Sequence, residues 1–167
     1  MTYIAEHPCL ELVLPPAAQP RPYRVPIYSL RVVRESSQKA ETKKIRSPRD
    51  AANIFREYIG HADREHFVLM MLDTKNQVVG LHTVSIGDLS SSIVHPREVF
   101  KVAVLTGAAS VIVAHNHPSG DTAPSPEDIA VTRRLSDAGE LLGIEVLDHV
   151  IIGGEIAFVS LKEKGLF

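Results

Sequence analysis

The sequence predicts an α+β sandwich, in which helices flank a mixed sheet. Two observations support this fold class. Helical and strand patterns follow one another along the chain without the regular β-α alternation of a doubly wound fold. The chain has 167 residues, which is enough for one ordinary domain with its own core and too few for two full domains. We therefore expect one domain over residues 47–167, preceded by an N-terminal arm over residues 1–46.

The N-terminal arm is predicted to be mostly extended. Its prolines exclude regular helix from the first 26 residues. Residues 9–14 and 28–33 are candidate strands, and residues 34–46 are polar and rich in lysine, which predicts a solvated loop.

Three helices are predicted from their start signals. Each has a proline at the first helical position, and a serine precedes that proline in the first and third. Apolar residues at helical spacing follow these starts. The predicted helices run from Ser47 to near Gly60, from His95 to about Ala109, and from Ser125 to Gly143, the last with Ile129, Leu135, Leu141 and Leu142 on its inner face.

Short apolar or alternating segments predict the strands. The first two surround a turn at residues 74–76 and should form a hairpin. The third is apolar and β-branched, which is typical of a buried strand. The last two flank the turn at Gly153 and Gly154. The predicted strands cover residues 67–72, 78–85, 111–114, 145–152 and 156–160.

Composition excludes several classes of function. A net charge of -2 and a pI of about 6.4 mean that no global field draws the chain to DNA or to an anionic membrane, so DNA binding would need a local patch. The only cysteine is Cys9, which excludes an internal disulfide and fits a reducing compartment. The first twenty residues lack the basic start of a signal peptide, and no apolar run approaches the length of a membrane span. We expect a cytoplasmic protein without membrane association.

His115 and His117 are candidate metal ligands. Because residues i and i+2 of an extended segment project from the same face, both imidazoles can reach one ion. Pro118 favours an extended His117, since the residue before a proline is pushed out of the helical region. Asn116 is expected to point the other way.

Asp128 is the third predicted ligand, on the first turn of the third helix and on the same face as Ser125. Two nitrogens and one carboxylate oxygen form the arrangement in which Zn²⁺ keeps a position for water and lowers its pKa to about 7. A second explanation needs no metal, because Ser125 and Asp128 also form a capping box, as Ser47 and Asp50 do with no histidine pair before them. The conjunction of the histidine pair with the helix start favours the zinc site.

The spacing of these residues resembles a known motif. His115-Asn116-His117, seven intervening residues, Ser125, two more and Asp128 are similar to the His-x-His-x7-Ser-x2-Asp motif of the JAMM (MPN-type) metallopeptidase superfamily. More narrowly, residues 113–120, the helix start at Pro96-Arg97-Glu98 and the segment Leu147-Asp148-His149 resemble the RadC family. The resemblance implies a JAB/MPN-like, cytidine-deaminase-like architecture, a three-layer-like sandwich with a curved, mixed sheet flanked by helices.

The resemblance also implies roles for two further residues. Family members place a glutamate near the start of the sheet as general base, and Glu65 is the match here, with Glu57 as the spare candidate. By resemblance, Glu65 would take a proton from zinc-bound water and pass it to the leaving amine, while Ser125 would donate a hydrogen bond to the oxyanion. His149, in a predicted strand, is expected to be a hydrogen-bonded core residue.

Two functions from different classes remain open. The first is a zinc-dependent hydrolase that cleaves an amide bond, peptide or isopeptide, in a protein or peptide substrate, at an extended tail that pairs with a sheet edge. The second is a non-proteolytic RadC-type module linked to DNA repair or recombination, in which the metal is structural. The presence of all five motif residues favours the first. The substrate and the oligomeric state stay open.

Overall fold

The computed structural model describes residues 24–87, 94–154 and 156–167. Within these residues, three helices and five strands are formed. In chain order they are α1 (Pro48–Ile59), β1 (His66–Leu72), β2 (Val78–Ile86), α2 (Pro96–Thr106), β3 (Ser110–His117), α3 (Pro126–Leu142), β4 (Glu145–Gly153) and β5 (Ala157–Ser160).

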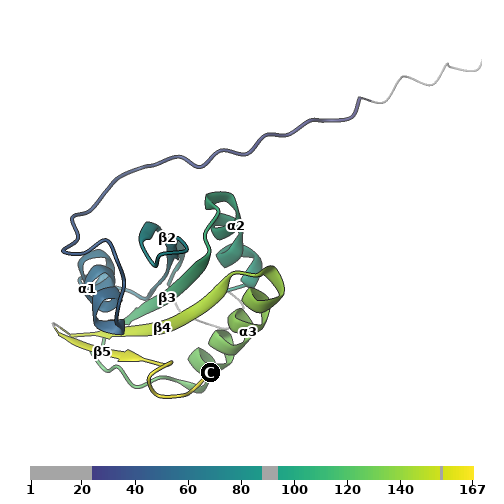
Figure 1. The fold of residues 1–167 in the computed structure, drawn as a ribbon. Helices are drawn as coiled ribbons and strands as arrows, with labels where there is room; N and C mark the ends of the chain where they lie inside the picture. The colour runs from purple at the N-terminus through teal and green to yellow at the C-terminus, as the bar shows by residue number, and fades with distance from the viewer. Residues whose placement is uncertain (1–23, 88–93, 155) are drawn as a thin grey trace, which may run out of the picture.

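The strands form one mixed sheet in the order β2-β1-β3-β4-β5. Only β3 and β4 run parallel; the other three pairs are antiparallel and include the predicted hairpins β1–β2 and β4–β5. Helix α1 covers one face of the sheet, and helices α2 and α3 cover the other (Figure 1). The predicted α+β fold with helices on both sides of a mixed sheet is confirmed.

The helices begin where the sequence predicted. Ser47 and Ser125 cap α1 and α3, each in a complete capping box with the aspartate three residues later. Helix α2 ends at Thr106 rather than near Ala109, because Gly107 adopts a left-handed conformation with a φ of 65°. The prediction extended this helix by about one turn.

Two predictions about apolar residues were wrong. Residues 28–33 form no strand, and their large side chains face solvent, with Ile27 beside them 96% exposed. Leu141 and Leu142 are exposed rather than inward, since the inner face of α3 ends at Gly139. A Cβ at Gly139 would lie 2.5 Å from the carbonyl oxygen of Ile144, so the helix backbone itself makes the close contact there.

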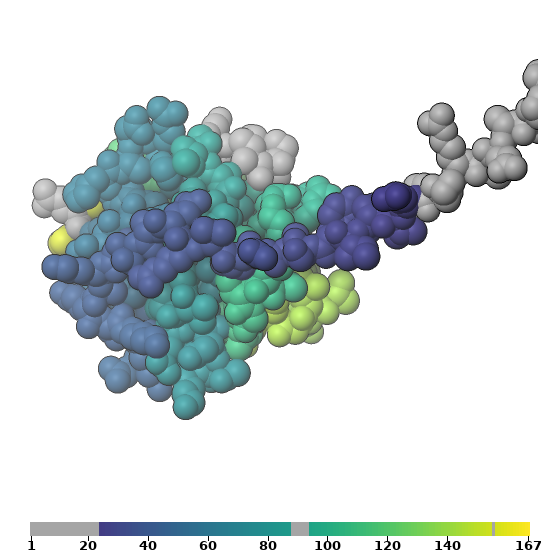
Figure 2. Space-filling view, turned by 90° about the horizontal axis from the view of Figure 1, so that it is seen from above, coloured from purple at the N-terminus to yellow at the C-terminus, as the bar shows by residue number. Residues whose placement is uncertain are grey.

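The arm joins the domain shortly before α1. Lys44 forms a bridge with Gln77, Ile45 is buried, and Gln38 donates a hydrogen bond to the carbonyl of Ile54 in α1, whereas the first described residues extend beyond the body of the molecule (Figure 2). The predicted loop at residues 34–46 is irregular apart from this bridge. The predicted strand at residues 9–14 lies outside the described residues.

Two clusters of buried apolar side chains, one on each face, hold the three layers together. One lies between α1 and the sheet and includes Phe55, Val68 and Ala114. The other lies beneath α2 and α3 and includes Phe67, Val113 and Leu135. Alternate residues of β3 therefore belong to different layers, which fixes the face on which each polar residue at its end projects.

Candidate metal centre

The central strand β3 holds the histidine pair. It runs on through His117, past the predicted end at residue 114, because β1 pairs with it as far as His115 and β4 as far as His117. The ring of His115 is fully buried on the face covered by α2 and α3, where it stacks on Phe67 with ring centroids 6.3 Å apart. His117 is half-buried and lies on the same face by the alternation of the strand.

Asp128 comes to the histidines from the first turn of α3. Its Oδ1 lies 3.4 Å from Nε2 of His115, and its Oδ2 lies 4.0 Å from Nε2 of His117. The two Nε2 atoms are 3.0 Å apart. One ligand atom from each of the three side chains therefore lies within 4.8 Å of the other two. The structure brings the three predicted ligands together.

The electrostatics of this cluster favour a cation. Burial lowers the pKa of His115 to about 4, opposed by the charge of Asp128 and reinforced by His117, so at neutral pH the contact with Asp128 is not an ion pair. Nδ1 of His117 lies 2.6 Å from the carbonyl oxygen of Asp121, which can only accept, so Nδ1 carries a proton and Nε2 is the nitrogen that faces His115 and Asp128. The Nε2 atoms of both histidines and the carboxylate of Asp128 thus converge on one point. Ligands of a tetrahedral zinc ion lie about 3.3 Å apart, close to the contacts found here.

Ser125 serves both as a helix cap and as a partner of the ligand. Oδ2 of Asp128 accepts hydrogen bonds from the main-chain N–H of Ser125 at 2.8 Å and from its hydroxyl at 2.7 Å. The hydroxyl in turn accepts from the Asp128 N–H at 3.1 Å. The capping box and the ligand set are therefore one arrangement. As an oxyanion donor, Ser125 would have to turn its single proton away from Asp128.

Glu65 lies just before β1, whose first residues pair with the end of β3 that holds the histidines. Phe67 pairs with His115 in the antiparallel register of β1 and β3, and continuing this register by two residues puts Glu65 opposite His117. Glu65 shares the strand parity of Phe67, and hence the face of the histidines. Glu57, the spare candidate, is exposed on α1, which covers the opposite face.

Asn116 points to the other face, as predicted, and secures the segment that contains Glu65. Its Oδ1 accepts from the N–H of His66 at 2.8 Å, and its Nδ2 donates to the carbonyl of Arg64 at 3.0 Å. These are the main-chain neighbours of Glu65 on either side. One amide thus bridges the end of β3 to the start of β1, a role that sequence reasoning did not assign.

His149 and Thr132 are the buried polar residues that sequence reasoning did not connect with the site. His149 is buried and hydrogen-bonded as predicted, but its partner is His115, with Nε2 2.8 Å from Nδ1 of that ring. Burial lowers the pKa of His149 well below its ordinary value. The signal was present in Leu147-Asp148-His149, where two polar residues interrupt an otherwise apolar strand.

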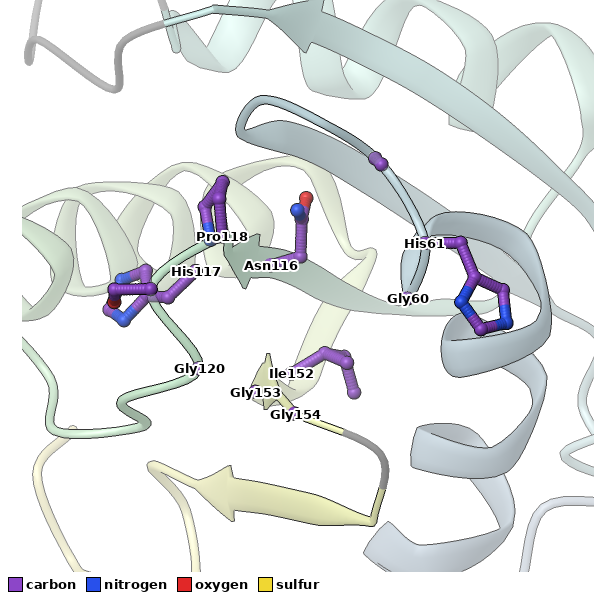
Figure 3. Close-up of a pocket in the computed structure, with 11 residues that line it drawn as sticks. Gly60, His61, Asn116, His117, Pro118, Gly120, Ile152, Gly153 and Gly154 are labelled. Atoms are coloured by element: carbon purple, nitrogen blue, oxygen red, sulfur yellow. The ribbon is translucent and has the colours of Figure 1, made fainter.

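A cavity of about 370 Å³ lies beside His117, at the C-terminal ends of β3 and β4. The end of α1 contributes His61 on the side away from His117 (Figure 3). Glycines from three segments make up much of the remaining wall, namely Gly60, Gly120, Gly153 and Gly154. The cavity therefore lies next to one proposed ligand, but most of its wall comes from the α1 side of the sheet.

Comparisons with known proteins agree with this architecture. Residues 45–166 match the family model described as RadC-like JAB domain. The chain is 55% identical over 134 residues to a UPF0758 protein of Desulforamulus reducens, and the aligned region covers 80% of this chain and 59% of that relative. It is 62% identical over 121 residues to a UPF0758 protein of Bacillus licheniformis, with coverages of 72% and 54%. The chain thus spans a little over half the length of these curated relatives. Among the described residues, no helix combines the length and apolar character needed to cross a membrane.

Proposed function

The chain belongs to the RadC-like JAB domain family, and from this premise we propose that it is a zinc-dependent hydrolase that cleaves an amide bond. The observation that carries the proposal is the convergence of two imidazole nitrogens and a carboxylate, from His115, His117 and Asp128, within 4.8 Å of one another. Three such ligands leave a coordination position free, which is the feature of catalytic rather than structural zinc sites.

Zinc is the ion that this donor set suits best. Imidazole nitrogen with a single carboxylate oxygen is a common catalytic zinc environment, whereas Mg²⁺ and Ca²⁺ prefer oxygen ligands throughout. When bound, zinc supplies Lewis-acid chemistry and lowers the pKa of a coordinated water to about 7. The described residues offer no cysteine as an alternative soft ligand, since the only cysteine of the chain is Cys9.

Glu65 is proposed as the general base. If the register of β1 and β3 continues past Phe67 and His115, Glu65 comes opposite His117, from where it would accept a proton from the attacking water and return it to the leaving amine. Asn116 holds the main chain on both sides of Glu65 and so limits its movement. Ser125 would donate to the developing oxyanion once its hydroxyl leaves Asp128.

We propose a protein or peptide as substrate, cleaved at a peptide or isopeptide bond. Glycines form part of the wall of the cavity beside His117, which leaves room there for the main chain of an extended segment. The edge strands of the sheet are β2 and β5, and an extended substrate can add main-chain hydrogen bonds along such an edge. A reducing, cytoplasmic setting is part of the proposal, on the evidence of the single cysteine.

The test combines metal analysis with a matched pair of variants. We expect the full chain to purify with one zinc per protein by elemental analysis and to cleave members of a peptide and isopeptide library. Glu65→Gln should retain zinc and lose at least about 100-fold in kcat, in the range of general-base catalysis. Glu57→Gln, a glutamate of the opposite face, is the control and should behave as wild type.

Three results would overturn the proposal. They are an absence of bound zinc under zinc-replete conditions, full activity of Glu65→Gln, and zinc-dependent cleavage of DNA without cleavage of any peptide bond. The absence of zinc would contradict the metal site. Full activity of Glu65→Gln would contradict the role of Glu65 as the base, and cleavage of DNA alone would contradict a protein or peptide substrate.

A further inference from the structure

A continuous chain of buried hydrogen bonds joins two of the proposed metal ligands through residues outside the ligand set. The hydroxyl of Thr132 lies 2.6 Å from the main-chain carbonyl oxygen of Asp128, one turn earlier on α3. The same hydroxyl lies 2.5 Å from Nδ1 of His149. Nε2 of His149 lies 2.8 Å from Nδ1 of His115. Thr132, His149 and His115 are each 0% exposed, so water does not compete for these groups.

The direction of every bond follows from the carbonyl at one end. A carbonyl oxygen only accepts, so the 2.6 Å contact with Asp128 takes the single proton of the Thr132 hydroxyl. The hydroxyl oxygen then accepts, and the proton of its second contact must come from Nδ1 of His149. A neutral imidazole with a proton on Nδ1 has a bare Nε2. His115 must therefore donate from its own Nδ1.

We propose that Thr132 and His149 are positioning residues that fix His115 in the tautomer with a bare Nε2. That nitrogen is the one 3.4 Å from Asp128 and 3.0 Å from His117. The inference rests on the proposed metal site for its purpose, because a metal-binding imidazole needs a free lone pair and gains orientation from a partner on its other nitrogen.

The opposite tautomer is disfavoured by the same contacts. A proton on Nε2 of His115 would leave Nδ1 as an acceptor and require His149 to donate from Nε2. Nδ1 of His149 would then be bare and would take the Thr132 proton. The hydroxyl oxygen and the Asp128 carbonyl oxygen would face each other at 2.6 Å with no proton between them. A buried acceptor pair of this kind costs about 1–3 kcal/mol. In the favoured tautomer, Nε2 of His115 can accept a proton from Nε2 of His117 across their 3.0 Å contact when no metal is bound, so no such pair forms there.

A register shift in the sheet places His149 in this chain. Val111 pairs with Val146, but the next residue of β3, Ile112, pairs with Asp148, so β4 has an extra residue at this point. Val113, on the face of α3, therefore pairs with His149. Without the extra residue that position would belong to Asp148, and His149 would project toward α1.

The two histidine ligands are thus oriented in equivalent ways. His117 donates its Nδ1 proton directly to the carbonyl of Asp121. His115 reaches the carbonyl of Asp128 through His149 and Thr132. In both cases a main-chain carbonyl, which cannot change its role, determines which ring nitrogen is free.

The experiment reads the tautomer directly in the full chain after zinc has been removed with a chelator. Long-range ¹H–¹⁵N NMR correlations of ¹⁵N-histidine-labelled protein distinguish a proton on Nδ1 from one on Nε2. We expect His115 of the wild type to show the Nδ1–H form alone. This measurement needs no variant and no bound metal, so it does not depend on hydrolase activity.

Three variants then test the cause. Thr132→Val removes the hydroxyl at nearly constant volume, and we expect mixed tautomers for His115 and a zinc affinity lower by about 10- to 100-fold in competition with a chromophoric chelator. Thr132→Ser keeps the hydroxyl and should show the single tautomer of His115 and the zinc affinity of the wild type. Thr106→Val is the matched control, because Thr106 also donates to a carbonyl one turn earlier, that of Val102, but contacts no histidine.

The outcomes separate this inference from the proposed function. A wild-type His115 with its proton on Nε2, or with both forms populated, would overturn the inference even if zinc binds. An unchanged tautomer and unchanged zinc affinity in Thr132→Val would overturn the role of Thr132. A fixed Nδ1–H form in a chain that binds no zinc would support the hydrogen-bond order and overturn the zinc hydrolase.

Discussion

The hydroxyl of Ser125 lies 2.7 Å from Oδ2 of Asp128, so the residue that caps α3 also orients a carboxylate of the metal cluster. The capping box of α1 offers a natural comparison. Asp50 accepts from the N–H of Ser47 at 3.0 Å, and its own N–H donates to the Ser47 hydroxyl at 3.4 Å. Both boxes start a helix, but only the one at Ser125 faces a histidine pair.

The first prediction contrasts the two capping serines. Ser47→Ala and Ser125→Ala should each lower the free energy of unfolding by about 1 kcal/mol, the usual cost of losing an N-cap side chain. Only Ser125→Ala should also weaken zinc binding, because it alone removes a hydrogen bond to a ligand oxygen. Urea denaturation and zinc competition measure the two effects. Equal zinc affinity in both variants would show that Ser125 is a cap and nothing more.

The second prediction concerns the amide that secures Glu65. Asn116→Asp keeps an acceptor for the N–H of His66 but cannot donate to the carbonyl of Arg64, so it brings a carboxylate against a carbonyl oxygen. We expect a loss of about 1–3 kcal/mol in the free energy of unfolding and a lower kcat. Zinc content by elemental analysis should not change, because Asn116 projects from the other face of β3. A variant with wild-type kcat would mean that Glu65 needs no such support.

The third prediction tests the close approach of the end of β4 to the loop that follows His117. A Cβ at Gly153 would lie 2.5 Å from the carbonyl oxygen of Gly120 and 2.6 Å from Cγ2 of Thr122. Gly153→Ala should therefore displace the segment that includes Asp121, whose carbonyl orients His117, at a cost of about 1–3 kcal/mol. The temperature of thermal unfolding and the affinity for zinc should both be lower than in the wild type.

Gly80→Ala is the control for this change. Gly80 lies in β2, and the only atom near a Cβ there is the flexible end of Met71 at 3.5 Å, an ordinary contact. This variant should unfold at or above the wild-type temperature, since alanine costs less backbone entropy than glycine. If Gly153→Ala were equally harmless, the loop over residues 118–124 would be free to move without consequence.

Local chemistry made most of the fold predictable. Ser-Pro starts and glycine ends define α1 and α3 through interactions within a few residues, and the hairpins follow from short turns between apolar segments. The strand predicted at residues 28–33 failed because a strand also needs a partner, which its own composition does not specify. The prediction that Leu141 and Leu142 face inward was wrong for a similar reason, since the end of α3 contacts the domain through its backbone at Gly139.

The metal cluster also has a part that local sequence predicts and a part that it does not. His115, His117 and Asp128 are close in sequence, so strand parity and a short loop were enough to predict their meeting. His149 reaches His115 only because of the register shift between β3 and β4. A one-residue insertion in a ladder changes the face of every later residue. The two polar residues in β4 indicate that something interrupts the apolar strand, but the pattern does not say which of them faces α3.

The fourth prediction concerns the pH dependence of the zinc-free protein. The folded pKa of His115, about 4, lies below the ordinary value of 6.5 that it has in the unfolded chain. Between these values the unfolded chain binds more protons than the folded one, so the free energy of unfolding rises with pH. His149 and the partly buried His82, whose pKa values burial also lowers, act in the same direction. We expect stability to fall as the pH is lowered from 6.5 toward 4.

Urea denaturation of the zinc-free chain at pH steps across this window tests the sign. Each histidine of this kind adds a slope of up to about 1.4 kcal/mol per pH unit. His115→Gln should lower the slope by about that amount near its steepest point, whatever its effect on overall stability. Because the comparison is between the slopes of the free energy of unfolding against pH, it remains valid for a variant that is less stable than the wild type. An unchanged slope in His115→Gln would show that this imidazole is protonated equally in both states, and that the burial of β3 does not keep its lone pair free for a metal at mildly acidic pH.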